Sequence, residues 1–230
     1  MLPLLYADDD LVVVHKPEGL ATIPERRPTG DSLVERLAAQ LGQRLWVVHR
    51  LDKDVSGVLL LARHPAAHRC LNDQFAARRV TKTYLALVHG RVTAGQGKVD
   101  LPLRAFGSGR MGVDPARGKP SATDYRVQWR EAAFTLLEAR PQTGRRHQLR
   151  VHLYALGHPI VGDRRYGDTT AQRGYDRLLL HAREVACRLP SQTPLCVGAP
   201  PPPSFDRLLD RLCPRGGRRS PRSAEPANRR

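Results

Sequence analysis

The sequence contains no run of apolar residues that approaches the roughly 18 needed to cross a bilayer, which excludes a membrane-spanning helix. Its opening residues, MLPLLYADDD, turn acidic too early for a secretory signal. There is no CxxC pair and no histidine at ligand spacing beside any of the four cysteines, which argues against a zinc site: Cys70, Cys187, Cys196 and Cys213. We therefore expect a cytoplasmic protein with reduced thiols, no membrane partner and no metal.

Lysine is also scarce, since only five of the 38 basic residues are Lys and the other 33 are Arg. With 22 acidic residues, the formal net charge is +16. Such a surface attracts polyanions, and Arg pairs with phosphate in a planar, two-pronged geometry. Genome composition, which the many Ala, Gly and Pro residues also reflect, explains the Arg content equally well. The charge is therefore compatible with a nucleic-acid partner and does not identify one.

The pattern of apolar residues predicts an α+β domain over residues 1–212, with a mixed, largely antiparallel central sheet flanked by helices and loops. Predicted helices are 31–41, with a capping box of Ser32 and Glu35, and 65–77, 146–156 and 205–212. Predicted strands are 11–14, 45–48, 58–61, 83–88, 123–128, 134–139 and 178–189. Residues 104–119, rich in Gly, Arg and Pro, read as an exposed loop. Residues 213–230 read as a basic tail with little reason to fold.

Polar residues concentrate between two apolar strands, in the segment His49-Arg50-Leu51-Asp52-Lys53-Asp54-Val55-Ser56-Gly57. A lone Asp in a loop is more often a turn former than a catalyst. Here two acids, two bases and a His stand together where a core strand begins. Loops at strand ends are favoured places for catalytic groups. Spacing alone therefore favours a functional loop only slightly over an ordinary turn.

A second segment runs from Thr143 through Gly167 and reads TGRRHQLRVHLYALGHPIVGDRRYG. Gly144 permits a tight turn before a helix, so Arg145 can be aimed inward from the helix start. Arg146 and Arg150 are four residues apart and would share one helical face. A helix with an exposed basic side explains these two Arg residues equally well. It explains the Gly- and His-containing loop that follows less well.

These segments carry a resemblance to a known family. HRLDKDVSG resembles the HRLDxxTSG signature of RluA-type RNA pseudouridine synthases, TKTYLALVHG is similar to their Lys-x-Tyr strand, and the 143–167 segment resembles their third motif. DDDLVVVHKPEGL and RLLLHA resemble flanking motifs, so the resemblance covers about residues 4 to 205 in the family's order. It implies the pseudouridine synthase fold in its compact single-domain form. It also implies isomerisation of uridine to pseudouridine without a cofactor.

The resemblance also assigns roles to residues. Asp52 would be the nucleophile at the ribose C1′, by covalent attack or by assisting elimination to a glycal, and Arg145 would pair with its carboxylate. Tyr84 would stack on the target base and could help remove the C5 proton, although a phenol with a pKa of about 10 is a poor base. Leu180 would form the floor of the uracil site. Arg50 would fill the space that the flipped uridine leaves, or contact phosphate.

The expected partner is a stem-loop of large-subunit ribosomal RNA, of tRNA, or of both, bound by a monomer. Arg146, Arg150 and the 104–119 loop are expected to contact its phosphates. Two residues depart from the family pattern: Val55 stands where Thr or Ser is usual, and Glu18 where a small residue is commoner, which we interpret as a surface change. The alternatives are a non-catalytic RNA-binding or ribosome-assembly factor with this fold and, with less support, a glycosidase or nuclease. The intact set of Asp52, Tyr84 and Arg145 favours the enzyme.

Overall fold

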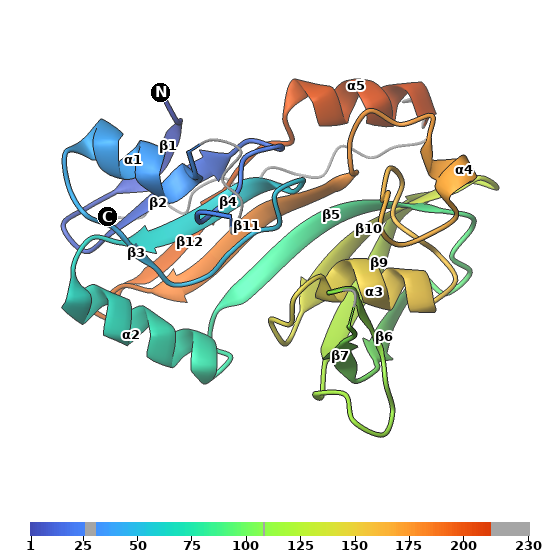
Figure 1. Cartoon of the computed structure of the whole chain (residues 1–230), viewed down its shortest axis with the longest axis horizontal. Coiled ribbons are helices and arrows are strands. Elements are labelled where there is room, and N and C mark those ends of the chain that lie inside the picture. Colours follow the sequence, from blue (N-terminus) through green and yellow to red (C-terminus); the bar gives the residue numbers. More distant parts are fainter. Residues whose placement is uncertain (26–30, 108, 213–230) are drawn as a thin grey trace.

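A computed structural model describes residues 1–25, 31–107 and 109–212 of the chain. Figure 1 shows a long twisted sheet, with α5 above it and α2 and α3 below it in this view. The helices are α1 (Leu33–Leu41), α2 (Pro65–Ala76), α3 (Gln148–Ala155), α4 (Thr169–Gln172) and α5 (Pro203–Leu212). The strands are β1 (Leu4–Ala7), β2 (Leu11–Lys16), β3 (Trp46–Val47), β4 (Ser56–Ala62), β5 (Thr81–His89), β6 (Gln96–Asp100), β7 (Leu103–Ala105), β8 (Met111–Val113), β9 (Ala122–Arg130), β10 (Phe134–Pro141), β11 (Leu180–Arg188) and β12 (Pro194–Gly198).

The main sheet has the strand order β1-β2-β4-β11-β5-β10-β9-β6, with β12 paired to β11 and β3 paired to β4. Its pairings are antiparallel except for one, in which His181 and Ala182 of β11 run parallel to Ser56 and Gly57 of β4. This arrangement confirms the prediction of an α+β domain with a mixed, largely antiparallel sheet. The parallel pair matters for the site, because it brings the start of β11 beside the start of β4.

Helices cover both faces of this sheet. In β2, Val12 and Val14 belong to the apolar cluster that also contains residues of α1 and α3. Leu11 and Val13 point to the opposite face and pack with residues of α2. Further along the sheet, α5 packs on the face opposite α3, against β5 and β10. This alternation of faces is the period-two pattern of a strand that is buried on both sides.

Helix α1 forms as predicted. The Ser32 side chain accepts a hydrogen bond from the Glu35 N–H and the Glu35 carboxylate accepts one from the Ser32 N–H, which completes the capping box. Gly42 ends the helix at φ 64°, a left-handed conformation that glycine adopts without steric cost. Local sequence was sufficient here because both caps are made by residues adjacent to the helix.

The prediction of an exposed loop over residues 104–119 is wrong in part. Its start and middle form an antiparallel hairpin of β7 and β8, separate from the main sheet. Leu103 and Met111 are buried against Val151 and Tyr166, and the Met111 N–H donates to the Tyr166 hydroxyl at 3.0 Å. The burying surface comes from residues about forty and more positions away, so the local composition could not reveal the hairpin.

The remaining expectations concern the termini and the cysteines. Residues 213–230, predicted as a basic tail, lie outside the described residues, as does Cys213. Cys70, Cys187 and Cys196 are free thiols. Among the residues described, no helix is both long and apolar enough to pass through a bilayer.

Candidate active site

A pocket of about 1030 Å³ opens where the loop before β4, the start of α3, and strands β5 and β11 meet. All seven residues that the sequence proposed for the site line this pocket: Arg50, Asp52, Tyr84, Arg145, Arg146, Arg150 and Leu180. They come from four segments that are far apart in the chain. The pocket therefore assembles the proposed site, although the contacts within it differ from those expected.

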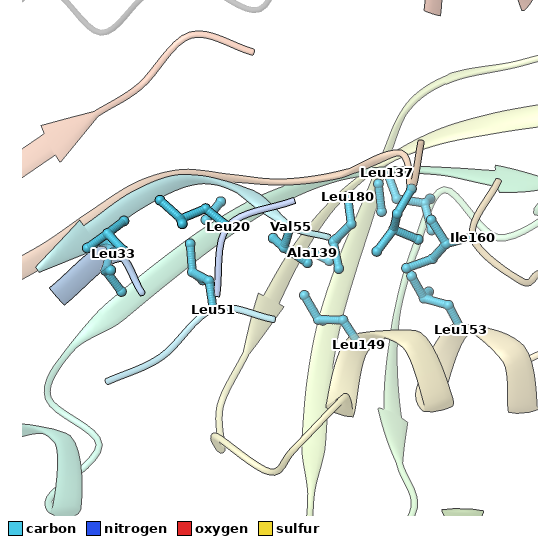
Figure 2. Close-up of a cluster of buried hydrophobic side chains, with 14 of the residues drawn as sticks. Leu20, Leu33, Leu51, Val55, Leu137, Ala139, Leu149, Leu153, Ile160 and Leu180 are labelled. Carbon is cyan, nitrogen blue, oxygen red and sulfur yellow. The ribbon is translucent and has the colours of Figure 1, made fainter. Parts of the chain in front are cut away.

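Buried apolar side chains fix the loop that carries Asp52. Leu51 and Val55 are only 6% and 2% exposed and lie in one cluster with Leu149 of α3 and Leu180 of β11, as Figure 2 shows. The Asp52 carboxylate lies between these two anchors and faces the pocket. Val55 occupies the position where Thr or Ser is usual in the family. Here it contributes apolar surface to the core, so the lost hydroxyl is replaced by packing.

Arg150, and not Arg145, holds the Asp52 carboxylate. Arg150 Nη1 lies 3.2 Å from Asp52 Oδ2, while its Nε and Nη2 bind both oxygens of Asp163 at 2.8 and 2.7 Å. The expected pairing of Asp52 with Arg145 is therefore wrong. So is the expectation that Arg150 contacts phosphate from an exposed helix face, because its side chain is 6% exposed.

The start of α3 explains this exchange of roles. His147 adopts a left-handed conformation at φ 53°, so the helix begins at Gln148 and not at the predicted residue 146. Arg150 then falls in the first helical turn and points inward, whereas Arg145 stays in the preceding turn. The Arg145 backbone N–H donates to the Gln148 side chain at 3.0 Å, which fixes that turn.

Arg150 remains charged in the folded protein. Burial disfavours its cationic form, but hydrogen bonding and attraction from Asp163, and then from Asp52, outweigh burial and raise the pKa of Arg150 above its usual value. The Asp163 carboxylate is completely buried and also accepts hydrogen bonds from the backbone of Arg165 and Tyr166. The guanidinium is thus held from one side and presents its remaining edge to Asp52.

His147 is the second group beside the nucleophile candidate, and it received no role from the sequence. Its Nε2 lies 3.7 Å from Asp52 Oδ2 and its Nδ1 lies 2.8 Å from the Tyr166 hydroxyl. Burial lowers the pKa of His147 to about 4, so the ring is neutral near pH 7. The sequence shows His147 between Arg146 and Arg150 of the third motif. Its contact with Asp52 depends on its own left-handed backbone conformation, which the sequence does not reveal.

Tyr84 and Leu180 belong to the apolar part of the pocket. Tyr84 lies on β5 opposite Ala182 of β11, and Leu180, which is 3% exposed, lies at the start of that strand. Burial, and then the nearby charge of Asp52, raise the pKa of the Tyr84 phenol above its usual value. A neutral phenol ring suits stacking on a base better than accepting a proton.

Lys16 supports the Asp52 loop from beneath, which the sequence did not suggest. Its side chain is completely buried, and Nζ donates to the backbone oxygens of Pro17 and Lys53 at 2.7 and 2.9 Å. Burial lowers the pKa of Lys16 to about 8, although the charges of Asp54 and Asp52 oppose this effect. Lys16 therefore fixes the backbone immediately after Asp52 and touches no pocket surface.

Glu18 is more than the surface change that the sequence suggested. Its carboxylate lies 3.0 Å from Arg177 Nη1 and accepts a hydrogen bond from Ser204. Arg177 also donates to the buried Ser56 hydroxyl at 2.9 Å. Glu18 thereby joins the turn after β2 to the start of β4 and to α5, contacts that only the tertiary structure creates.

His49 has a structural role in the loop that carries Asp52. Along one of its edges, β4 pairs with β11 at the start of the strand and with β3 at its end. Between these two partners, the Leu60 N–H donates a hydrogen bond to His49 Nε2 at 3.0 Å. The imidazole stacks on Phe75 at a centroid distance of 5.1 Å. Burial lowers the pKa of His49 to about 3, which keeps Nε2 free to accept.

We expect stability to fall as the pH is lowered from about 6.5 towards 3, because the unfolded chain then binds protons that folded His49 cannot. One such group changes the free energy of unfolding by about 1.4 kcal/mol per pH unit where it acts fully. Urea unfolding at a series of pH values measures this slope. In His49→Gln, the amide oxygen can still accept the hydrogen bond from Leu60. The change in the free energy of unfolding per pH unit should be smaller in this variant by about the contribution of one histidine. An unchanged slope would contradict the assignment.

No group of three or more His, Cys, Asp and Glu side chains in residues 1–25, 31–107 and 109–212 is placed to hold a metal ion. Around Asp52, the pocket instead combines a carboxylate, a guanidinium that orients it, a neutral imidazole and an apolar wall. Such a set can stabilise positive charge at a carbon atom or attack it, next to a surface that accepts a planar ring.

Comparison with known proteins agrees with this chemistry. A family model described as RNA pseudouridylate synthase matches residues 10–155. The chain is 42% identical over 194 residues to the Escherichia coli "Dual-specificity RNA pseudouridine synthase RluA", covering 83% of this chain and 88% of that protein. It is 37% identical over 213 residues to an uncharacterized RNA pseudouridine synthase of Zymomonas mobilis, covering 89% of this chain and 96% of that one.

Solved structures show the same fold. The human RNA pseudouridylate synthase domain containing 1 superposes with a TM-score of 0.76 at 31% identity, covering 90% of this chain and 87% of the human one. Human RNA pseudouridylate synthase domain containing 4 gives a TM-score of 0.75 at 29% identity, covering 91% and 92%. The sequence match and the shared fold show that the chain belongs to the RNA pseudouridylate synthase family, whose members isomerise uridine in RNA.

Proposed function

We propose that this pocket converts uridine to pseudouridine in RNA with Asp52 as its nucleophile. The observation that carries the proposal is the Asp52 carboxylate, held by Arg150 at 3.2 Å inside a pocket that Tyr84 and Leu180 also line. Cleavage of the N1–C1′ bond builds positive charge on C1′, and an ionised carboxylate can attack or stabilise that centre. The charge of Arg150 and its anchorage on Asp163 keep the carboxylate oriented for this step.

The rest of the reaction requires the freed uracil to turn within the pocket. The C5–C1′ bond then forms, the proton on C5 is lost and N1 regains a proton, so substrate and product are isomers and no electrons are exchanged. Keeping both fragments enclosed makes the second bond an intramolecular event. Tyr84 and Leu180 supply the apolar surfaces between which a planar base can lie. The raised pKa of Tyr84 favours stacking over removal of the C5 proton.

The proposed substrate is a uridine in a stem-loop of large-subunit ribosomal RNA, of tRNA, or of both. A uridine must leave its stack to reach Asp52, which costs a few kcal/mol and favours loops over duplexes. Relatives named as dual-specificity RNA pseudouridine synthases support the possibility of two kinds of RNA target. Exposed Arg50 and Arg146 at the pocket rim suit the vacated stack or nearby phosphates. We further propose that the protein acts as a cytoplasmic monomer.

Release of tritium tests this function. RNA transcribed with [5-³H]uridine, as ribosomal RNA fragments and as tRNA, should lose label to water when the purified protein is added. Modification of one target uridine would release one equivalent of label per RNA molecule. No release from either class of RNA, with binding to both intact, would favour the non-catalytic RNA-binding alternative.

A further inference from the structure

Two partly buried cationic side chains on one wall of the pocket have no acidic partner among the described residues. Lys82 of β5 and Arg145 both line the pocket, and neither forms an ion pair with any carboxylate of the described residues. Arg150, in contrast, contacts both Asp52 and Asp163. A cation that is partly removed from water without an anion is costly, so this wall suits an anionic ligand.

Arg145 shows this lack of partners most directly. Its Nε is buried and has no hydrogen-bond partner among the described residues. Its Nη2 makes only a long contact, 3.5 Å, with the backbone oxygen of Pro120. Buried donors in folded proteins are nearly always satisfied, so an unpaired donor on a pocket wall indicates a group that arrives with the ligand.

Lys82 lies against the turn that carries Arg145. Its Nζ is 3.9 Å from the position that a Cβ on Gly144 would occupy, and Gly144 directly precedes Arg145. The ammonium group lies 6.0 Å from the centre of the Phe75 ring, which shields it from water on one side. Burial lowers the pKa of Lys82 below its usual value, as expected for a cation without a compensating charge.

The position of Lys82 relative to Tyr84 identifies the kind of anion. The two residues are two positions apart on β5, which runs through the middle of the sheet in Figure 1, and both face the pocket. Two residues of an antiparallel strand span about 6.8 Å. A nucleotide whose base stacks on Tyr84 can place its own backbone phosphate over such a span, while Asp52 next to the base is already held by Arg150.

We propose that Lys82 and Arg145 together bind one RNA phosphate adjacent to the uridine in the pocket. This inference rests on the proposed function, because it takes the base on Tyr84 as its reference point. It gives Arg145 a different role from the one the sequence suggested. Arg145 is a substrate-binding residue that positions the nucleotide, and of the two arginines it is Arg150 that contacts Asp52.

Binding of a transcribed tRNA anticodon stem-loop at several KCl concentrations tests the proposal without depending on turnover. Lys82→Met and Arg145→Met should each weaken binding about tenfold and lower the slope of log K against log [KCl] by about 0.7–0.9, the value for one phosphate. Lys82→Arg should retain most of the affinity and the slope. Arg207→Met removes an exposed charge from α5, on the opposite face of the sheet, and should change neither by more than about twofold.

The double variant Lys82→Met/Arg145→Met decides whether the two residues share a phosphate. If they do, the second substitution should cost less affinity than it does alone, and the slope should fall by about one phosphate in total. Additive losses with a slope change of about two phosphates would overturn the shared site, and wild-type slopes in both single variants would overturn phosphate binding altogether.

Turnover separates this inference from the proposed function. On [5-³H]uridine-labelled RNA, the two Met variants should raise KM with kcat within about threefold of wild type, because the phosphate contact is the same in the ground and transition states. A large fall in kcat with unchanged KM would overturn the phosphate role. If wild type released no tritium, the proposed function would fail, yet the salt dependence would still decide the phosphate site. Circular dichroism confirms that each variant folds.

Discussion

Replacing Asp52 with Asn is expected to reduce tritium release from labelled RNA by about 10⁴-fold or more. The amide has nearly the shape of the carboxylate and can still accept a hydrogen bond from Arg150, so the loop should keep its conformation. It cannot attack C1′ or neutralise positive charge there, which removes the step that the proposal assigns to this side chain. Initial rates measured over a range of RNA concentrations give the effect on kcat and KM separately.

Asp54→Asn is the matched control for this variant. Asp54 is exposed on the same loop, two residues further on, and is not among the pocket-lining residues. The control removes the same charge but should leave kcat within about twofold, since surface substitutions of this kind have small effects. Retention of more than a hundredth of the activity in Asp52→Asn, with RNA binding unchanged, would exclude Asp52 as the nucleophile.

Replacing Arg150 with Met is expected to abolish turnover and also to destabilise the fold. The completely buried Asp163 would lose both hydrogen bonds from the guanidinium and remain as an uncompensated charge, which typically costs about 3–5 kcal/mol. Asp52 would lose the group that orients it. Urea unfolding measures the first effect and tritium release measures the second. Arg146→Met, which removes an exposed charge four residues before Arg150, should leave the free energy of unfolding within about 0.5 kcal/mol.

A double variant distinguishes the two roles of Arg150. In Arg150→Met/Asp163→Asn the uncompensated charge is gone, so part of the stability should return. Turnover should not return, because Asp52 still has no guanidinium. Recovery of both together would mean that Arg150 acts only through folding, and would contradict its role as a positioning residue for Asp52.

The sequence predicted elements whose determinants are local. The capping box of Ser32 and Glu35 and the stop at Gly42 gave α1 its limits, because those contacts lie within the helix and its neighbours. The resemblance of three motifs to one family gave the site its members, and all of them line one pocket. In both cases the information lies in short local segments: the helix with its caps, and each motif taken by itself.

The contacts within the site were harder to predict from the sequence. The choice of Arg145 over Arg150 as the partner of Asp52 failed because it depends on where α3 begins. That start is set by the left-handed backbone of His147, a conformation that is uncommon for residues other than Gly, although His adopts it more often than most. Glu18 and the hairpin of β7 and β8 were misjudged for a related reason, since their partners, Arg177 and Tyr166, lie far away in sequence.

The sequence by itself determined the kind of domain and the family, and it led to the proposal of Asp52 as the nucleophile. Only the tertiary structure decided which guanidinium holds that carboxylate. It also decided which two partly buried cations of the pocket wall lack an acidic partner among the described residues. The physical reason is that charge pairing inside a protein depends on distance and burial. Both are set by the packing of β4, β5, β11 and α3 around the pocket. The start of α3 at Gln148 thus decides that Arg150, and not Arg145, pairs with Asp52.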